Sequence, residues 1–207
     1  ITYPIGKSAK SFEIPNGVTN IAEYAFAACE SLESITFSDS VTSIGTGVFE
    51  FCVNLSSVLL GEKMVSIGDW AFEFCSKLTC IKIPKSVTSI GKGVFELCSG
   101  LADVYYEGTV EEWENISFDS GNSYLMDSTI YYYSENAPTS YGNFWHYVDS
   151  VITVWSEYSL SDYSKGLKFE SNGDGTCYVS GIGTCNESEI VIPSVSPDNE
   201  KVVGIGG

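Results

Sequence analysis

Residues 78–101 read LTCIKIPKSVTSIGKGVFELCSGL, one turn of a repeat that returns every 23 residues. Three apolar positions recur in each unit without slippage. They are Ile21, Ile44, Ile67 and Ile90; Phe26, Phe49, Phe72 and Phe95; and Cys29, Cys52, Cys75 and Cys98. A coil of this size cannot bury its apolar face alone and must stack on the next one. The period therefore predicts a solenoid.

The order of residues within one unit predicts the path of the coil. Ile81 and Ile83 alternate with a polar residue, which is the period of a strand with one buried face. Pro84 ends that strand, since proline has no N–H to donate to a neighbour. Phe95 and Cys98 are spaced as in a helical or 3₁₀ turn with one side facing inward. We expect an α/β-type repeat solenoid, β-rich, whose strands form a parallel sheet.

The cysteines of the repeat form a column along the stack. Two interpretations are open: thiols buried as small hydrophobes, or disulfides or a metal string between coils. Side chains in parallel register point the same way, which is poor geometry for a disulfide. We therefore expect buried free thiols. Cys80 differs, because strand alternation points it outward on the exposed face of the sheet.

Residues 12–106 resemble the BspA-like class of leucine-rich repeats, a group found in bacterial cell-surface and secreted proteins. The resemblance rests on IPKSVTSIG at residues 83–91 and on Val94, Phe95, Cys98 and Leu101 after it. A weaker likeness extends to Tyr132, where arrays of this family often close. The resemblance implies a right-handed leucine-rich-repeat stack and an adhesin, a binding module or another surface protein. The family brings no catalytic residues, and we predict no enzyme.

Three segments follow from these patterns. Residues 1–133 are expected to form the array with a closing helix and strand, because Thr109 and Glu112 make a capping box. Residues 134–165 are rich in aromatic side chains and are predicted to be a linker or cap. Residues 166–207 are predicted to be a hairpin cap that opens a second short stack, truncated at its end. We therefore expect the chain to be a piece of a longer one.

The segment after residue 133 holds several features without a repeat. An aromatic cluster comprises Tyr141, Phe144, Trp145, His146, Tyr147 and Trp155. We expect it to cover the open end of the first stack, the alternative being a patch that stacks on sugars or fills a partner's pocket. His146 is interpreted as structural. A turn signal at residues 172–175 predicts a hairpin. Whether Cys177 and Cys185 are paired stays open.

The composition is strongly acidic, since 27 acidic and 10 basic side chains give a net charge of −17. This balance argues against nucleic acid, whose phosphates need clustered lysine and arginine. It argues equally against an anionic membrane surface, and no apolar stretch is long enough for membrane insertion. We predict an extracellular or bacterial cell-surface protein, monomeric and without a cofactor or metal, whose acidic surface keeps it dispersed.

The outward side chains of the predicted sheet form the candidate binding surface. Alternation assigns to it Ser34, Thr36, Ser57, Leu59, Cys80, Lys82, Asp103 and Tyr105. We predict that this surface contacts a protein or carbohydrate ligand in a non-enzymatic binding or adhesion module. The alternative is a structural spacer within a larger surface protein. Glu50, Glu73 and Glu96 share one repeat position and are expected to be a solvated stripe.

Overall fold

The structure, a computed structural model, describes residues 9–136, 138, 142–155, 168–173, 176–181 and 201–205. The chain divides into two compact units, residues 1–133 (unit 1) and residues 134–207 (unit 2). Unit 1 carries the 23-residue repeat. Unit 2 carries the aromatic cluster and the predicted hairpin.

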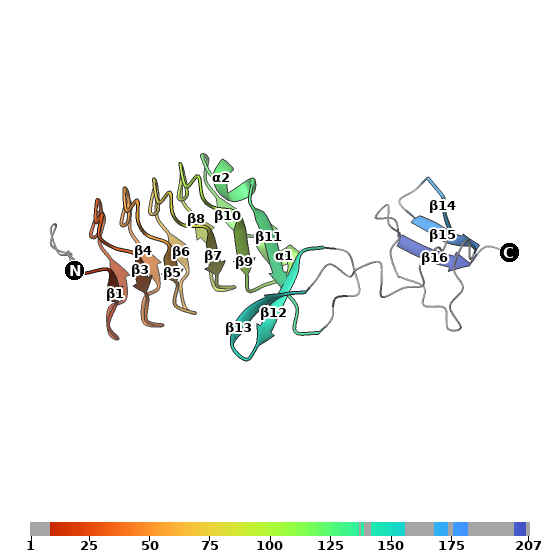
Figure 1. Ribbon diagram of the computed structural model, residues 1–207, viewed down its shortest axis with the longest axis horizontal. Coiled ribbons are helices and arrows are strands. Elements are labelled where there is room, and N and C mark those ends of the chain that lie inside the picture. Colours follow the sequence, from red (N-terminus) through yellow and green to blue (C-terminus); the bar gives the residue numbers. More distant parts are fainter. Residues whose placement is uncertain are drawn as a thin grey trace. The chain divides into compact units, whose positions relative to one another are not determined.

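The longer strands of unit 1 lie side by side in one row, which we call the strand row (Figure 1). They are β1 (Ser11–Glu13), β3 (Ser34–Thr36), β5 (Ser57–Leu59), β7 (Cys80–Ile83), β9 (Asp103–Tyr106) and β11 (Thr129–Tyr133). Paired strands run parallel, and equivalent residues of the repeat face each other, as do Ile35 and Val58. The strand row is the parallel sheet that the alternation predicts.

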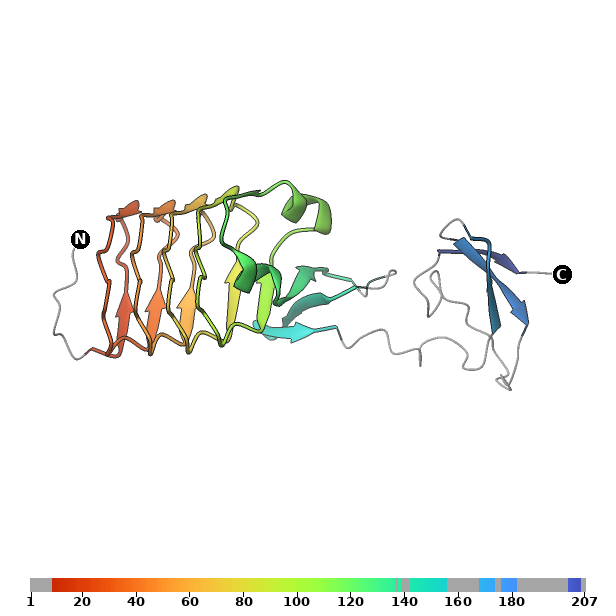
Figure 2. The ribbon, with the colours of Figure 1, turned by 90° about the horizontal axis from the view of Figure 1, so that it is seen from above.

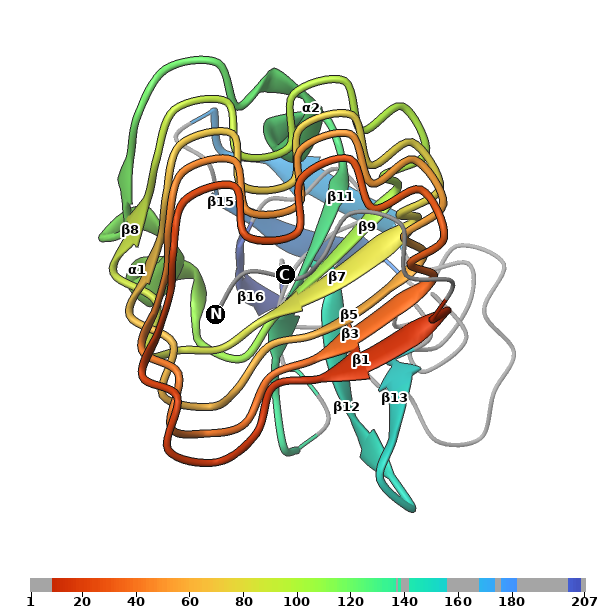
Figure 3. The ribbon, with the colours of Figure 1, turned by 90° about the vertical axis from the view of Figure 1, so that its left-hand side faces the viewer.

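A second row of two-residue strands lies on the opposite side of each coil (Figures 2 and 3). These strands are β2 (Asn20–Ile21), β4 (Ser43–Ile44), β6 (Ser66–Ile67), β8 (Ser89–Ile90) and β10 (Ser117–Phe118). They pair in parallel, and the first four bring the repeated isoleucines into register. Along the stack, Figure 3 shows the outlines of successive coils nested on one another. The predicted solenoid is confirmed.

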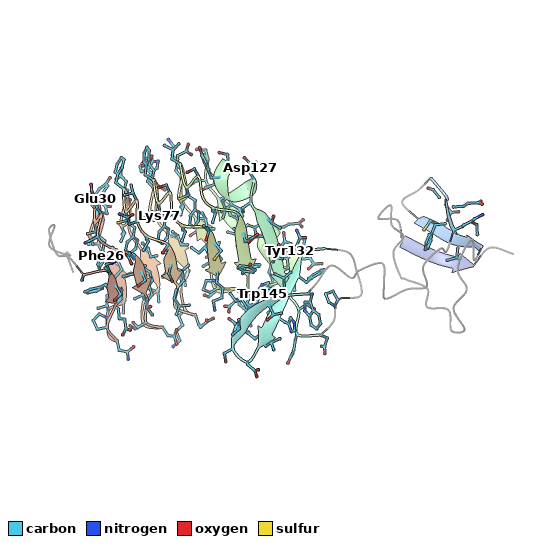
Figure 4. All side chains as sticks on the ribbon, in the orientation of Figure 1. Phe26, Glu30, Lys77, Asp127, Tyr132 and Trp145 are labelled. Carbon is cyan, nitrogen blue, oxygen red and sulfur yellow. The ribbon has the colours of Figure 1, made fainter. Side chains whose placement is uncertain are left out.

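The core of unit 1 contains columns of identical side chains. The rings of Phe26, Phe49, Phe72 and Phe95 stack in that order, with centroids 5.2, 5.2 and 5.5 Å apart. Phe26, labelled in Figure 4, begins the column, and all four rings are fully buried. Burying one such side chain stabilises the fold by about 1.5–3 kcal/mol. The repeat thus keeps its register because each ring packs on its equivalent.

The cysteine column runs beside the phenylalanines as buried free thiols, as predicted. The thiols donate to main-chain carbonyl oxygens of the preceding coil, Cys52 to Phe26 at 3.1 Å, Cys75 to Phe49 at 3.3 Å and Cys98 to Phe72 at 3.0 Å. Burial raises the pKa of Cys52 to about 12. A thiol that stays protonated is a poor nucleophile. Cys80, in contrast, is exposed, again as predicted.

Helix α1 (Val110–Glu114) begins at the predicted capping box. The Glu112 N–H donates to the Thr109 hydroxyl at 3.3 Å, and the Thr109 N–H donates to the Glu112 carboxylate at 2.9 Å. These two bonds satisfy donors that a helix start leaves without a partner. Trp113 is buried on the inner side of the helix, as expected of a closing element.

Helix α2 (Ser123–Met126) follows and was not predicted. Its N-cap residue Asn122 is buried, and the side-chain oxygen accepts from the Val94 N–H at 3.0 Å. The amide nitrogen donates to the Gly91 carbonyl at 2.8 Å. The side chain of Asn122 thus makes hydrogen bonds where backbone groups make them in the earlier coils. These bonds join the last turn to the coil before it.

Unit 2 begins with an antiparallel hairpin of β12 (Phe144–Val148) and β13 (Val151–Val154). Asp149 and Ser150 connect the strands with φ of 50° and 66°, the conformation of a tight type I′ turn. The sequence analysis did not predict this hairpin, because an Asp-Ser pair is a weak turn signal. The His146 ring stacks on Trp155 at 3.8 Å between centroids, which agrees with a structural role.

A second sheet of unit 2 contains β14 (Lys168–Ser171), β15 (Thr176–Gly181) and β16 (Lys201–Ile205). β14 and β15 pair antiparallel, as the predicted hairpin requires, and β16 pairs parallel with β15. Cys177 is buried. Tyr141, residues 174 and 175 of the predicted turn, and residues 182–200, which include Cys185, lie outside the described residues. The capping role of these segments, the second array and the state of Cys185 therefore stay predictions.

Candidate binding face

The strand row presents outward the side chains that alternation assigns to it, which together we call the sheet face. Buried Ile35, Val58, Ile81 and Val104 alternate with them. Ser57, Leu59 and Cys80 are exposed, and Ser34, Thr36, Asp103 and Tyr105 are half-buried. Lys82 is the exception, since only 9% of it is exposed. The structure brings all eight residues onto one face, and one of them is covered.

Lys82 is covered because two carboxylates from neighbouring coils close over it. Its Nζ lies 2.8 Å from Oε1 of Glu62 and 2.5 Å from Oε1 of Glu107. Glu62 is 55% exposed and Glu107 only 13% exposed. Lys82, which alternation assigns to the exposed surface, is therefore largely withdrawn from solvent. A buried ammonium needs paired anions, and the adjoining coils supply both.

The two carboxylates differ in environment. Burial raises the pKa of Glu107, and its hydrogen bond with Glu62 raises it further, against the opposing effect of Lys82. Burial also acts on Glu62, but hydrogen bonds from Glu107 and Lys82 prevail and lower the pKa of Glu62. One ammonium thus pairs with two carboxylates, of which Glu107 takes up a proton more readily than Glu62. The role of these ion pairs is structural.

Tyr105 and Tyr131 extend the sheet face with stacked rings. They face each other in the register of β9 and β11, with centroids 5.2 Å apart. Burial raises the pKa of Tyr105 to about 12, with Asp103 adding to the rise, so its phenol stays neutral at physiological pH. A neutral hydroxyl on a stacked ring can donate a hydrogen bond while the ring makes apolar contact. The pair gives this end of the face its largest aromatic surface.

Three residues of this region were missed by the sequence analysis: Glu62, Glu107 and Tyr131. Glu62 and Glu107 follow their strands and occupy different repeat positions, so alternation within one strand does not place them over Lys82. Tyr131 follows a break in the 23-residue spacing. Its signal was the aromatic run at residues 131–133, which matches Tyr105 and Tyr106 once β11 is paired with β9.

No candidate metal site is found among the residues that the structure describes. In that part of the chain, no group of three or more histidine, cysteine, aspartate or glutamate side chains is placed to hold a metal ion. The Glu112 carboxylate is engaged in the helix cap. The helices that the structure describes include none long and apolar enough to cross a membrane. The sheet face is thus a candidate surface for contact with a partner.

Two parallel rows of strands, columns of identical buried residues and an outward sheet face define a solenoid of the leucine-rich-repeat class. The sequence model of the BspA type leucine rich repeat region matches residues 5–124 in six copies. The chain belongs to this family of leucine-rich repeat proteins.

Solved structures with the same fold include one bacterial cell surface protein. A leucine rich cell surface protein from Faecalibacterium prausnitzii A2-165 is 31% identical at a TM-score of 0.53, over 58% of this chain and 38% of that one. The T. pallidum leucine rich repeat protein TpLRR is 24% identical at a TM-score of 0.53, over 62% of this chain and 60% of that one. The pneumococcal vaccine antigen PcpA is 20% identical at a TM-score of 0.53, over 67% of this chain and 33% of that one. The last two likenesses show the fold alone.

The chain spans less than two thirds of the length of these solved proteins. No curated protein matches the sequence.

Proposed function

We propose that this chain is a non-enzymatic binding or adhesion module of a cell-surface or secreted protein, and that the sheet face contacts a protein or glycan. The observation that carries the proposal is the mixed character of the face. Leu59 is 49% exposed in its middle, and the stacked pair of Tyr105 and Tyr131 lies toward its end. Aromatic anchors among small polar side chains are typical of recognition surfaces.

Rigidity of the strand row supports this function. Inward residues are locked in stacked columns, so the outward side chains stand at fixed spacings. A preorganised surface loses less conformational entropy when it binds. The relative from Faecalibacterium prausnitzii is described as a cell surface protein, which supports the same location for this chain. The net charge of −17 favours dispersion outside the cell over contact with nucleic acid.

The test compares two variants of the full chain on arrays of purified extracellular proteins and glycans. Leu59→Ala with Tyr105→Ala removes the apolar anchors of the sheet face. Val65→Ala is the matched control, because Val65 is 44% exposed beside the second row. We expect the strongest wild-type signal to fall about tenfold or more in the double variant and to persist in the control. Equal signals in both would refute the role of the sheet face.

A structural spacer within a larger surface protein is the second candidate function. It is supported by the hydrogen bonds that join every coil to the next, such as that from the Phe49 N–H to the Ala71 carbonyl at 2.7 Å. A stack of this kind resists extension along its axis. Wild-type protein that binds nothing on either array, although folded, would favour the spacer over the binding module.

A further inference from the structure

Four coils of unit 1 each carry two residues with a left-handed backbone. The first position holds Tyr24, Gly47, Trp70 and Gly93, with φ of 54°, 58°, 53° and 57°. The second holds Ala28, Phe51, Phe74 and Leu97, with φ of 57°, 60°, 59° and 58°. Glycine adopts this conformation without strain, whereas a bulky residue destabilises the fold there. An aromatic ring held on a strained backbone is a candidate for a role in binding.

At the first position, aromatic residues and glycines alternate from coil to coil. A Cβ on Gly47 would overlap the ring of Tyr24, and a Cβ on Gly93 would lie 3.0 Å from Cδ1 of Trp70. Each glycine thus leaves room for the ring of the coil before it. Tyr24 is still 51% exposed, so its ring is held in place and faces solvent.

At the second position, Phe51 and Phe74 stack almost face to face. Their centroids are 4.5 Å apart and their planes differ by 15°. Phe51 remains 44% exposed and Phe74 is half-buried. We call Tyr24, Phe51, Trp70 and Phe74 the aromatic edge.

Carboxylates lie beside these rings. Glu50, Glu73 and Glu96 each precede a residue of the second position, and all three are half-buried. The predicted solvated stripe is thus only partly open to solvent. A Cβ on Gly47 would lie 3.1 Å from Oε2 of Glu50. The Glu50 carboxylate and the Tyr24 ring therefore lie beside the same glycine. A Cβ on Gly93 would likewise lie 3.5 Å from Cβ of Glu96, beside the Trp70 ring.

In the part of the chain that the structure describes, Glu50, Glu73 and Glu96 make no ion pair with a lysine. Burial raises the pKa of Glu73, and the adjoining Glu50 and Glu96 raise it further, because stacking brings like charges together. Lys92 is the nearby cation that the structure places on a ring, with Nζ 5.4 Å from the centre of the Trp70 ring. A ring of the aromatic edge thus already receives a cation on its face.

We propose that the aromatic edge, with its flanking glutamates, binds an arginine-bearing segment of a partner polypeptide. A guanidinium group is planar, stacks on aromatic faces and pairs with carboxylates through two parallel hydrogen bonds. The aromatic edge offers both kinds of group side by side. The net charge of −17 favours the approach of a cationic partner.

Other ligands fit this surface less well. A metal ion would find no use for the rings, and the described residues contain no group of acids placed to hold one. A neutral sugar would use the rings and leave the carboxylates of Glu50, Glu73 and Glu96 without a counter-charge. The aromatic edge is separate from the sheet face, so this proposal is tested independently of the proposed function.

The test titrates the full chain with a fluorescein-labelled peptide of alternating arginine and glycine, followed by fluorescence anisotropy. Phe51→Ala with Phe74→Ala introduces the residue that Ala28 already provides at the same repeat position. Trp70→Gly introduces the residue of Gly47 and Gly93. The repeat itself thus shows that these substitutions suit the backbone, and thermal unfolding checks that the variants are folded. We expect affinity to fall about tenfold in the combined variant.

Charge and site controls accompany this variant. Glu50→Gln with Glu73→Gln and Glu96→Gln should weaken binding by a similar factor. Leu59→Ala with Tyr105→Ala should leave it unchanged. A peptide with citrulline in place of arginine should not bind, and a lysine peptide should bind more weakly than the arginine peptide.

Two outcomes would overturn the proposal. One is equal binding of the arginine and lysine peptides, undiminished in the aromatic variant, which would indicate unspecific attraction to an acidic protein. The other is a glycan-array signal that the aromatic variant loses and the glutamine variant keeps, which would make the aromatic edge a carbohydrate surface.

Discussion

The strand row and the aromatic edge are built from the same 23-residue repeat, yet different rules set their side-chain directions. On the strand row, strict alternation turns Ile35 and Val58 inward and Ser57 and Leu59 outward. On the aromatic edge, left-handed residues reverse the chain, so Phe72 is buried and Phe74 faces partly outward. The period identifies equivalent residues, whereas the local backbone determines which of them reach solvent.

The comparison is tested most strongly by two phenylalanines that lie two residues apart. Phe72→Ala should lower the free energy of unfolding by about 3–5 kcal/mol, since it opens a cavity in the stacked column. Phe74→Ala should lower it by only about 0.5 kcal/mol, because the side chain is half-exposed and its backbone is strained. Urea denaturation of both variants measures the difference. Equal losses would show that the edge and the core do not differ as described.

Much of the fold could be predicted from the sequence because a solenoid repeats one local solution. Once Ile81 and Ile83 are assigned inward, the period carries that assignment to the other coils. The same logic placed Cys80 and Leu59 on the outside. It failed for Lys82, because the carboxylates that cover it come from different repeat positions in neighbouring coils. Burial of a polar side chain depends on these long-range contacts.

The aromatic edge was beyond the sequence analysis for a related reason. Tyr24 and Gly47 share one repeat position but differ in chemistry, so the 23-residue match hides their relation. The relation becomes visible only in the structure, where the backbone has positive φ and a Cβ in one coil would crowd the ring of the coil before it. Asn122 is a similar case, since it replaces backbone contacts at the point where the period breaks.

Lys82 offers the second test, within the strand row. Lys82→Met should lower the free energy of unfolding by about 2 kcal/mol at neutral pH, because it leaves the mostly buried Glu107 beside Glu62 without a cation. Lys10→Met is the matched control. Lys10 pairs with Glu33 at 2.8 Å, but both are exposed, so no measurable loss is expected.

The pH dependence of the Lys82→Met variant provides a further check. The pKa of Glu107 is raised in the folded protein, so the folded state binds its proton more tightly than the unfolded state does. The ionised carboxylate therefore destabilises the fold above the ordinary glutamate pKa, and protonation relieves this as the pH falls. The difference between variant and wild type should shrink in acid. A constant difference would contradict the pairing seen here.

Thr109 tests the closing turn, where the sequence signal was local and strong. Thr109→Ala removes the hydroxyl that accepts from the Glu112 N–H, and we expect a loss of about 1 kcal/mol in thermal or urea unfolding. Thr109→Ser keeps that acceptor and should recover most of the stability. If alanine and serine behaved alike, the capping box would not stabilise the end of the array.

Glu73→Gln has the smallest expected effect and is the most specific test. It should stabilise the fold, whereas the other substitutions should destabilise it. The pKa of Glu73 is raised by burial and by Glu50 and Glu96, so the ionised form destabilises the folded state at neutral pH. Glu73→Gln should therefore raise the free energy of unfolding, by about 0.5 kcal/mol once solvent screening is considered. The gain should vanish as the pH falls through the ordinary glutamate range, since both states then bind the proton. Glu23→Gln, at an exposed position, should show no such gain. A loss of stability in Glu73→Gln at neutral pH would mean that the glutamates of the edge attract more than they repel, and would remove the charge imbalance on which the arginine site depends.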